Sequence, residues 1–116
     1  MSTANQMPGD RACRYAREAE TVLRAYALRQ EGDLAWGLVR LVEDAADGLE
    51  QTVGGDDTDA FDAVSCRYAQ VKAIISAALN DADDDLVYAS ESLVEMAKEM
   101  IDAEHNRRRS PKKARS

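Results

Sequence analysis

The sequence predicts an all-α protein: a four-helix bundle built from two duplicated helical hairpins, followed by a disordered basic C-terminal tail. Three observations lead to this fold class. Apolar side chains recur at three- and four-residue steps in four segments, which is the period of an amphipathic helix. Aromatic residues make up only 5% of the 116 residues and alanine is abundant, which favours close helix packing over a β-sandwich. The tetrapeptide Cys-Arg-Tyr-Ala also occurs twice.

This repeated tetrapeptide indicates an internal duplication. It lies at 13–16 and again at 66–69, and later segments match at nearly the same offset, first 53 and then 52 residues. The aligned copies run over 13–51 and 66–104, with eleven identical positions. Cysteine and tyrosine are rare here, so their matching in order favours duplication over chance similarity of two alanine-rich helices.

The first hairpin is expected over residues 10–52, after a flexible N-terminus at 1–9. Asp10 follows a Pro-Gly pair and is suited to cap the first helix, and Gly32 is suited to end it. Asp33 can then cap the second helix. Each helix has one apolar stripe, and the first stripe includes Tyr15.

The second hairpin is expected over residues 59–105, after a Gly/Asp linker at 53–58. Thr58 or Asp59 can cap the third helix, which turns Tyr68 inward. An acidic turn precedes the fourth helix, where negative charge favours a helix N-terminus. The fourth helix has a near-heptad seam (Leu86, Ala89, Leu93, Met96, Met100, Ala103) beside a second row (Val94, Ala97, Ile101). A lone hairpin buries too little surface to be stable, so the two hairpins should pack together.

Charge is distributed unevenly along the chain. The net charge is −7, but residues 1–105 hold nine bases and 22 acids, a net charge of −13. Such a body should not bind nucleic acid, which requires clustered Lys and Arg. The tail, 106–116, carries only bases and could bind nucleic acid weakly, fold back on the acidic body or simply aid solubility. Its basic residues are Arg107, Arg108, Arg109, Lys112, Lys113 and Arg115.

The chain shows no feature of a membrane or secreted protein. Its longest uncharged, mostly apolar run is Ala73–Leu79, which is too short to span a bilayer, and its first ten residues lack the apolar region of a signal peptide. We therefore expect a cytoplasmic location and no membrane partner. Cys13 and Cys66 should be buried thiols there, unless they approach across the bundle axis as a redox pair.

No catalytic or cofactor-binding pattern is present. The single histidine, His105, and two distant cysteines lack the spacing of metal ligands. The acidic run 81–85 resembles the start of a calcium loop, but Leu86 and Ser92 stand where that loop needs glycine and glutamate. The sequence therefore predicts a protein that is not an enzyme and has no cofactor and no metal.

Acidic side chains follow two of the expected helices. Like charges four residues apart cost a few tenths of a kcal/mol per pair, so a carboxylate ladder calls for an explanation beyond helix stability. A solubilising outer face is one explanation, and a surface for a basic partner or a mimic of a phosphate backbone is another. The expected protein-interaction residues are Glu91, Glu95, Glu99 and Asp102 on the fourth helix and Glu43 and Asp47 on the second.

These features favour a small, non-enzymatic helical module that presents an acidic face to a protein partner. The apolar stripes of the second and fourth helices look wide, which makes a homodimer plausible. One alternative is a mobile-element-encoded inhibitor of a host nucleic-acid-binding enzyme, acting as an acidic mimic or a steric blocker, for example against host defence. Another is an accessory protein that binds nucleic acid through its basic tail.

The second half also resembles a known kind of domain. Ser65-Cys66 early in one helix, an acidic turn, and Leu93-Val94-Glu95-Met96-Ala97-Lys98 in the next look like short, uncharacterised helical-hairpin domains of proteobacteria. The resemblance covers about 60–105. It implies two packed helices, and it carries over no activity and no functional residue.

Overall fold

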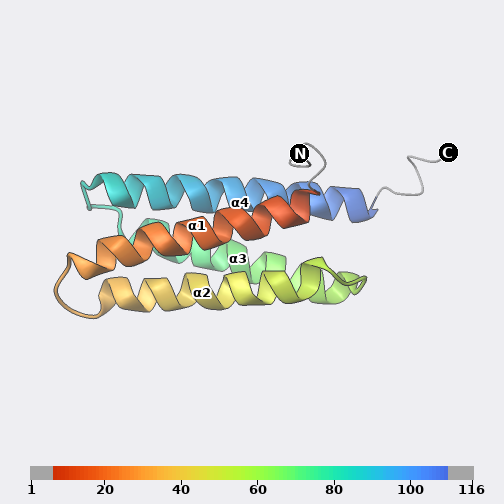
Figure 1. Ribbon diagram of the computed structural model, residues 1–116, viewed down its shortest axis with the longest axis horizontal. Coiled ribbons are helices and arrows are strands. Elements are labelled where there is room, and N and C mark those ends of the chain that lie inside the picture. The colour runs from red at the N-terminus through yellow and green to blue at the C-terminus, as the bar shows by residue number, and fades with distance from the viewer. Residues whose placement is uncertain (1–6, 110–116) are drawn as a thin grey trace.

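The computed structural model describes residues 7–109 and consists of four helices joined by short turns (Figure 1). They are α1 (Pro8–Leu28), α2 (Leu34–Val53), α3 (Thr58–Ala78) and α4 (Asp85–Arg109). Successive helices run in opposite directions around one apolar core. The predicted four-helix bundle is confirmed.

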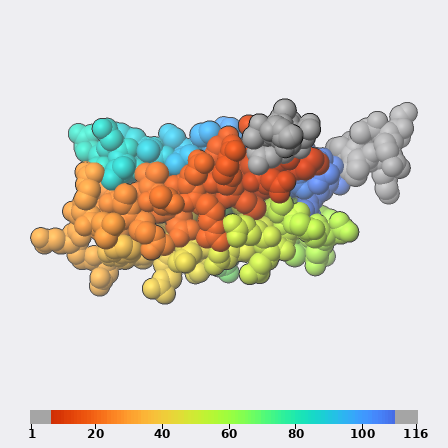
Figure 2. All heavy atoms as spheres, viewed as in Figure 1, coloured from red at the N-terminus to blue at the C-terminus, as the bar shows by residue number. Residues whose placement is uncertain are grey.

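Each helix has two neighbours. The backbone of α1 packs against α2 and α4, and that of α3 packs against the same two helices from the other side. Within residues 7–109 the backbones of the diagonal pairs, α1 with α3 and α2 with α4, do not come into contact. Figure 2 shows one face of this arrangement, with α1 lying between α4 and α2.

The closest pair is formed by the first helix and the last. The buried face of α1 begins with small side chains, Gly9, Ala12, Ala16 and Ala19, which let a neighbouring backbone approach closely. At Gly9 the fit is tight on both sides of α1, because a Cβ atom there would lie 2.9 Å from Cγ1 of Val53 on α2 and 3.4 Å from Cδ of Glu104 on α4. The alanine content noted in the sequence thus has a specific use in the packing of α1.

The helix boundaries differ from those expected at several points. α1 begins at Pro8, whose fixed φ suits the first turn of a helix, and Asp10 lies inside that turn instead of capping it. α3 is capped by Asp57, whose carboxylate accepts a hydrogen bond from the backbone N–H of Ala60 at 3.0 Å. Gly32 has a φ of +91°, so it serves the α1–α2 turn as the residue in the left-handed region.

The segment expected to begin the disordered tail is helical. α4 continues through Asn106 and ends at Arg109 because the side chains of its last turn are tied to the bundle, as described below. The prediction of disorder from Asn106 is therefore wrong up to Arg109. The other expected tail residues, Lys112, Lys113 and Arg115, lie outside the described residues.

The two halves of the duplicated pattern are only partly equivalent in the fold. Positions of α2 and α4 that correspond in the alignment are buried alike, for instance Val42 with Val94 and Leu49 with Ile101. The first helices of the hairpins differ. Tyr68 is fully buried, whereas Tyr15 is only half-buried and has the guanidinium of Arg14 5.3 Å from its ring centre. The expectation that both tyrosines point inward is wrong for Tyr15, because α1 turns its small residues toward the core.

The fourth helix buries the second of its two apolar rows. Val94, Ala97 and Ile101 are at most 2% exposed, whereas Met96 of the predicted seam is 38% exposed. Since α4 packs against both α1 and α3, its core-facing stripe is centred between them. This rotation leaves one edge of the predicted seam on the surface.

Candidate functional site

The outer face of α4 carries a row of exposed side chains at four-residue spacing. Tyr88 is 52% exposed and Met96 38%, and Ser92 lies between them on the same side of the helix. Together with Glu91 and Glu95 they line an open hollow of about 540 Å³. Two large apolar side chains thus stand beside two carboxylates on a face with no neighbouring helix over it.

The ring of Tyr88 is held in place from the turn before α4. Its hydroxyl donates a hydrogen bond of 2.9 Å to Oδ1 of Asp83. That bond to a carboxylate, with the negative charge of Asp83, raises the pKa of Tyr88 above its ordinary value. The tyrosine therefore stays a neutral donor, and its ring stands out from the helix in one orientation.

The carboxylate ladder of α4 is partly neutralised within the bundle. Glu95 forms an ion pair of 3.0 Å with Lys72 of α3, and Asp102 forms one of 2.9 Å with Lys98 one turn earlier. Glu91 and Glu99 form no ion pair with any residue in 7–109. The ladder therefore presents two uncompensated charges and two compensated ones.

The acidic residues of α2 serve a different contact. Arg17 of α1 donates hydrogen bonds to Asp47, Glu50 and Glu20, which ties α1 to α2 on their common outer edge. Hydrogen bonding to Arg17 lowers the pKa of Glu50, and the same contacts raise the pKa of Arg17. Glu43, the other predicted interaction residue of α2, is half-buried.

The two predicted acidic sets do not combine into one surface. Their helices, α2 and α4, are diagonal in the bundle, and α1 lies between them on the face shown in Figure 2. Glu91, Glu95, Glu99 and Asp102 therefore form one candidate surface, and Glu43 and Asp47 lie apart from it.

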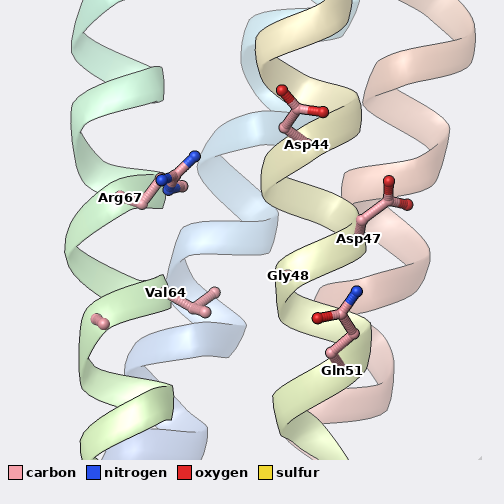
Figure 3. Close-up of a pocket in the computed structure, with 7 residues that line it drawn as sticks. Asp44, Asp47, Gly48, Gln51, Val64 and Arg67 are labelled. Atoms are coloured by element: carbon pink, nitrogen blue, oxygen red, sulfur yellow. The ribbon is translucent and has the colours of Figure 1, made fainter.

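A groove runs between α2 and α3 (Figure 3). One wall carries Asp44, Asp47 and Gln51 of α2, and the other carries Val64 and Arg67 of α3, around a space of about 420 Å³. Gly48 of α2 also lines it, and a Cβ atom there would lie 3.6 Å from Cγ2 of Val64. The groove mixes an acidic wall, one cation and an apolar floor.

A buried carboxylate organises the C-terminal end of α4. Glu104 is 1% exposed and accepts hydrogen bonds from Nε and Nη2 of Arg107 at 3.0 and 2.7 Å and from Nε of Arg108 at 2.7 Å. Burial alone would raise the pKa of Glu104. The hydrogen bonds and charges of the two arginines outweigh it and hold that pKa below its ordinary value.

Arg108 extends this cluster to the end of α2. Its Nη2 donates hydrogen bonds to the backbone carbonyls of Val53 at 3.1 Å and Thr52 at 3.4 Å in the last turn of α2. The carbonyl of Thr52 also accepts a hydrogen bond from the backbone N–H of Gly55 at 3.1 Å. Its guanidinium also lies 4.4 Å from the ring centre of Phe61, whose edge contacts the ring of His105. Of the six bases assigned to a nucleic-acid-binding tail, Arg108 thus joins α4 to α2 and α3, and Arg107 is paired with Glu104 of its own helix.

The two cysteines do not form a pair. Cys13 lies half-buried on α1 and Cys66 exposed on α3, both as free thiols, and these helices are diagonal. Burial, with smaller contributions from Glu50 and Asp10, raises the pKa of Cys13 to about 11. The expectation of buried thiols fails for Cys66, and the alternative of a redox pair across the axis has no geometric support.

Other kinds of site were also sought in the described part of the chain. No three His, Cys, Asp or Glu side chains of residues 7–109 lie close enough together to hold a metal ion. None of the four helices combines the length and apolar character needed to cross a membrane. Comparison of the chain with protein-family models, curated proteins and solved structures found no match.

Tyr88 and Met96 are the residues of the α4 face that the sequence analysis did not assign to a site. Met96 was expected in the apolar seam of the fourth helix, and no role was predicted for Tyr88. The sequence holds one relevant signal, since both residues lie four positions from Ser92, opposite the row that includes Val94 and Ala97.

Proposed function

We propose that the protein is a non-enzymatic interaction module that binds a basic protein surface on the outer face of α4. One observation carries the proposal: Tyr88 and Met96 stand exposed beside the carboxylates of Glu91 and Glu95 around one hollow. Protein interfaces typically combine an apolar or aromatic centre with a polar rim. Here the rim is acidic, so the partner should be basic.

The physical features of this face suit recognition of a helix. Tyr88 is already oriented by its bond to Asp83, which reduces the entropy lost on binding. Apolar anchors along one helix are complementary to the apolar face of an amphipathic partner helix. Lysine or arginine residues flanking that face would meet Glu91 and Glu99, which have no ion pair within residues 7–109.

Two alternatives draw less support from these contacts. A mimic of a phosphate backbone would need dense negative charge, about one per 3.4 Å of each strand. Carboxylates four residues apart on a helix are spaced by about 6 Å, and those of Glu95 and Asp102 are paired with lysines. Nucleic-acid binding through the tail is less favoured because Arg107 and Arg108 already form ion pairs with Glu104. A cytoplasmic location belongs to the same proposal.

The test compares what different variants capture from an extract of the native host. The binding variant is Tyr88→Ala combined with Glu91→Lys, and the matched control is Trp36→Ala combined with Glu43→Lys, which changes an exposed aromatic residue and an acid on α2. A partner retained by the wild type and the control but lost by the binding variant supports the proposal.

A second measurement defines the chemistry of the partner. A synthetic amphipathic helix with lysines beside its apolar face should bind the wild type, more weakly as salt rises. The same peptide with glutamates in place of lysines should not bind. If the binding variant captures the same proteins as the wild type, or if both peptides bind equally, the assignment to α4 is wrong.

A further inference from the structure

The outer face of α3 is unlike the other surfaces of this protein. Charged residues make up 32% of the chain, yet the stretch 63–78 contains only two, Arg67 and Lys72, both basic. Most exposed side chains there are small or uncharged: Ala63, Cys66, Ala69, Gln70, Ala73, Ile74, Ser76, Ala77 and Ala78. Ile74, a large apolar residue, is 44% exposed in the middle of this face.

The spacing of these residues suits contact with another helix. Ala63, Cys66, Gln70, Ala73 and Ala77 follow one another at alternating steps of three and four, the period of a helix–helix seam. Four of the five are small, so a second helix could approach closely. No helix of residues 7–109 covers this face, because α2 and α4 pack on the inner flanks of α3.

We propose that this face, residues 63–78 of α3, is where two copies of the chain meet, with their α3 helices antiparallel in a two-fold symmetric dimer. Charge determines which face a second copy can use. Residues 7–109 carry a net charge of −10, so two copies should repel through their acidic α2 and α4 faces, whereas the α3 face carries few charges and a positive balance.

The two-fold geometry also makes the charges at the edge of this face complementary. Arg67 and the acidic wall of Asp44 and Asp47 lie on the same edge, across the α2–α3 groove shown in Figure 3. In an antiparallel two-fold dimer, the α2 edges of the two copies lie on the same side of the interface. Arg67 of each copy therefore comes to the side that holds Asp44 of the other, whereas Asp47 stays paired with Arg17 of its own chain.

A stable interface buries about 800 Å² on each partner, which is roughly a tenth of the 7019 Å² surface of this chain. Residues 63–78 span about 24 Å of helix, so the proposed interface also includes the edges of α2 and α4 beside α3. The remaining acidic face of α4 would stay open in each copy, so this proposal does not depend on the function proposed above.

The test is the oligomeric state of the full chain and two matched variants, measured by sedimentation equilibrium over a range of concentrations. Ala73→Glu places a good helix former with a negative charge in the centre of the α3 face, at a side chain already exposed in the single chain. Ala89→Glu makes the same change on the outer face of α4. Circular dichroism is used to check that both variants keep the helical content of the wild type.

We expect the wild type and Ala89→Glu to form dimers with the same dissociation constant, and Ala73→Glu to weaken the dimer by at least about tenfold. Cross-linking with a bis-maleimide in a Cys13→Ser background should join two copies through Cys66. A wild type that remains monomeric at all concentrations, or a dimer weakened by Ala89→Glu and not by Ala73→Glu, would overturn the proposal.

Discussion

Replacing Glu104 with glutamine should lower the free energy of unfolding by about 2–3 kcal/mol. The carboxylate accepts three charge-assisted hydrogen bonds, each worth about 1.5–3 kcal/mol when measured alone. Glutamine keeps the volume and one acceptor oxygen, and Arg107, whose side chain is 47% exposed, can turn to water. The loss is therefore concentrated on Arg108, whose side chain is only 9% exposed and would keep its charge with a weaker partner.

The measurement is urea unfolding followed by circular dichroism, since urea leaves ionic interactions unscreened. For a chain of this size the expected change corresponds to a fall in Tm of roughly 10 °C. The control is Glu99→Gln, an exposed position on the same helix, where the effect should stay below about 0.5 kcal/mol. Equal effects of the two variants would refute the reasoning that the buried carboxylate holds the end of α4.

The difference in unfolding free energy between the wild type and Glu104→Gln should depend on pH, and the structure gives the sign of that dependence. The pKa of Glu104 is lower in the folded protein than its ordinary value of 4.5, so the folded state holds the carboxylate in its charged form. Its contribution is present above the pKa of the unfolded chain and is lost as pH falls through the depressed folded pKa. The stability difference between the wild type and Glu104→Gln should therefore shrink below about pH 4.5, and a constant difference would contradict the assignment.

Three further predictions test the packing and the thiols. Tyr68→Phe should leave the free energy of unfolding unchanged or raise it by up to about 1 kcal/mol, because the buried hydroxyl has no hydrogen-bond partner in the described structure. A fall in that free energy of more than about 1 kcal/mol, measured by urea unfolding, would contradict this reasoning. Gly9→Ala should destabilise by about 1 kcal/mol through its clash, whereas Gly37→Ala, with open space around it, should stabilise by about 0.5 kcal/mol through helix propensity; thermal unfolding distinguishes the two signs. At concentrations low enough to keep the chain monomeric, iodoacetamide at neutral pH should alkylate Cys66 much faster than Cys13, whose pKa of about 11 leaves little thiolate. Equal rates by mass spectrometry would show that α1 opens readily.

The number of helices and their antiparallel order were accessible from the sequence because apolar periodicity is a local property. The direction each helix faces was less accessible, because it depends on which neighbours a helix acquires. Tyr15 and Tyr68 occupy aligned positions, yet only the second is in the core. A repeated motif fixes a local conformation and leaves the rotation of the helix to its tertiary contacts.

The acidic ladder of α4 was visible in the sequence, and its pairing was not. Lys72 reaches Glu95 from another helix, and Arg17 joins acids more than thirty residues away, so no local pattern reveals either contact. Glu104 differs, because Arg107 and Arg108 follow it by three and four residues, a spacing at which helical side chains meet. That spacing is a local signal for a helix through Arg109, but the basic, polar composition of 106–116 led to a prediction of disorder instead.

The close packing of α1 on α4 has a consequence for synthesis. Because α4 follows the other three helices in the chain, the apolar face of α1 stays partly uncovered during synthesis until α4 has been made. A chain truncated before α4 would expose that face to chaperones and proteases.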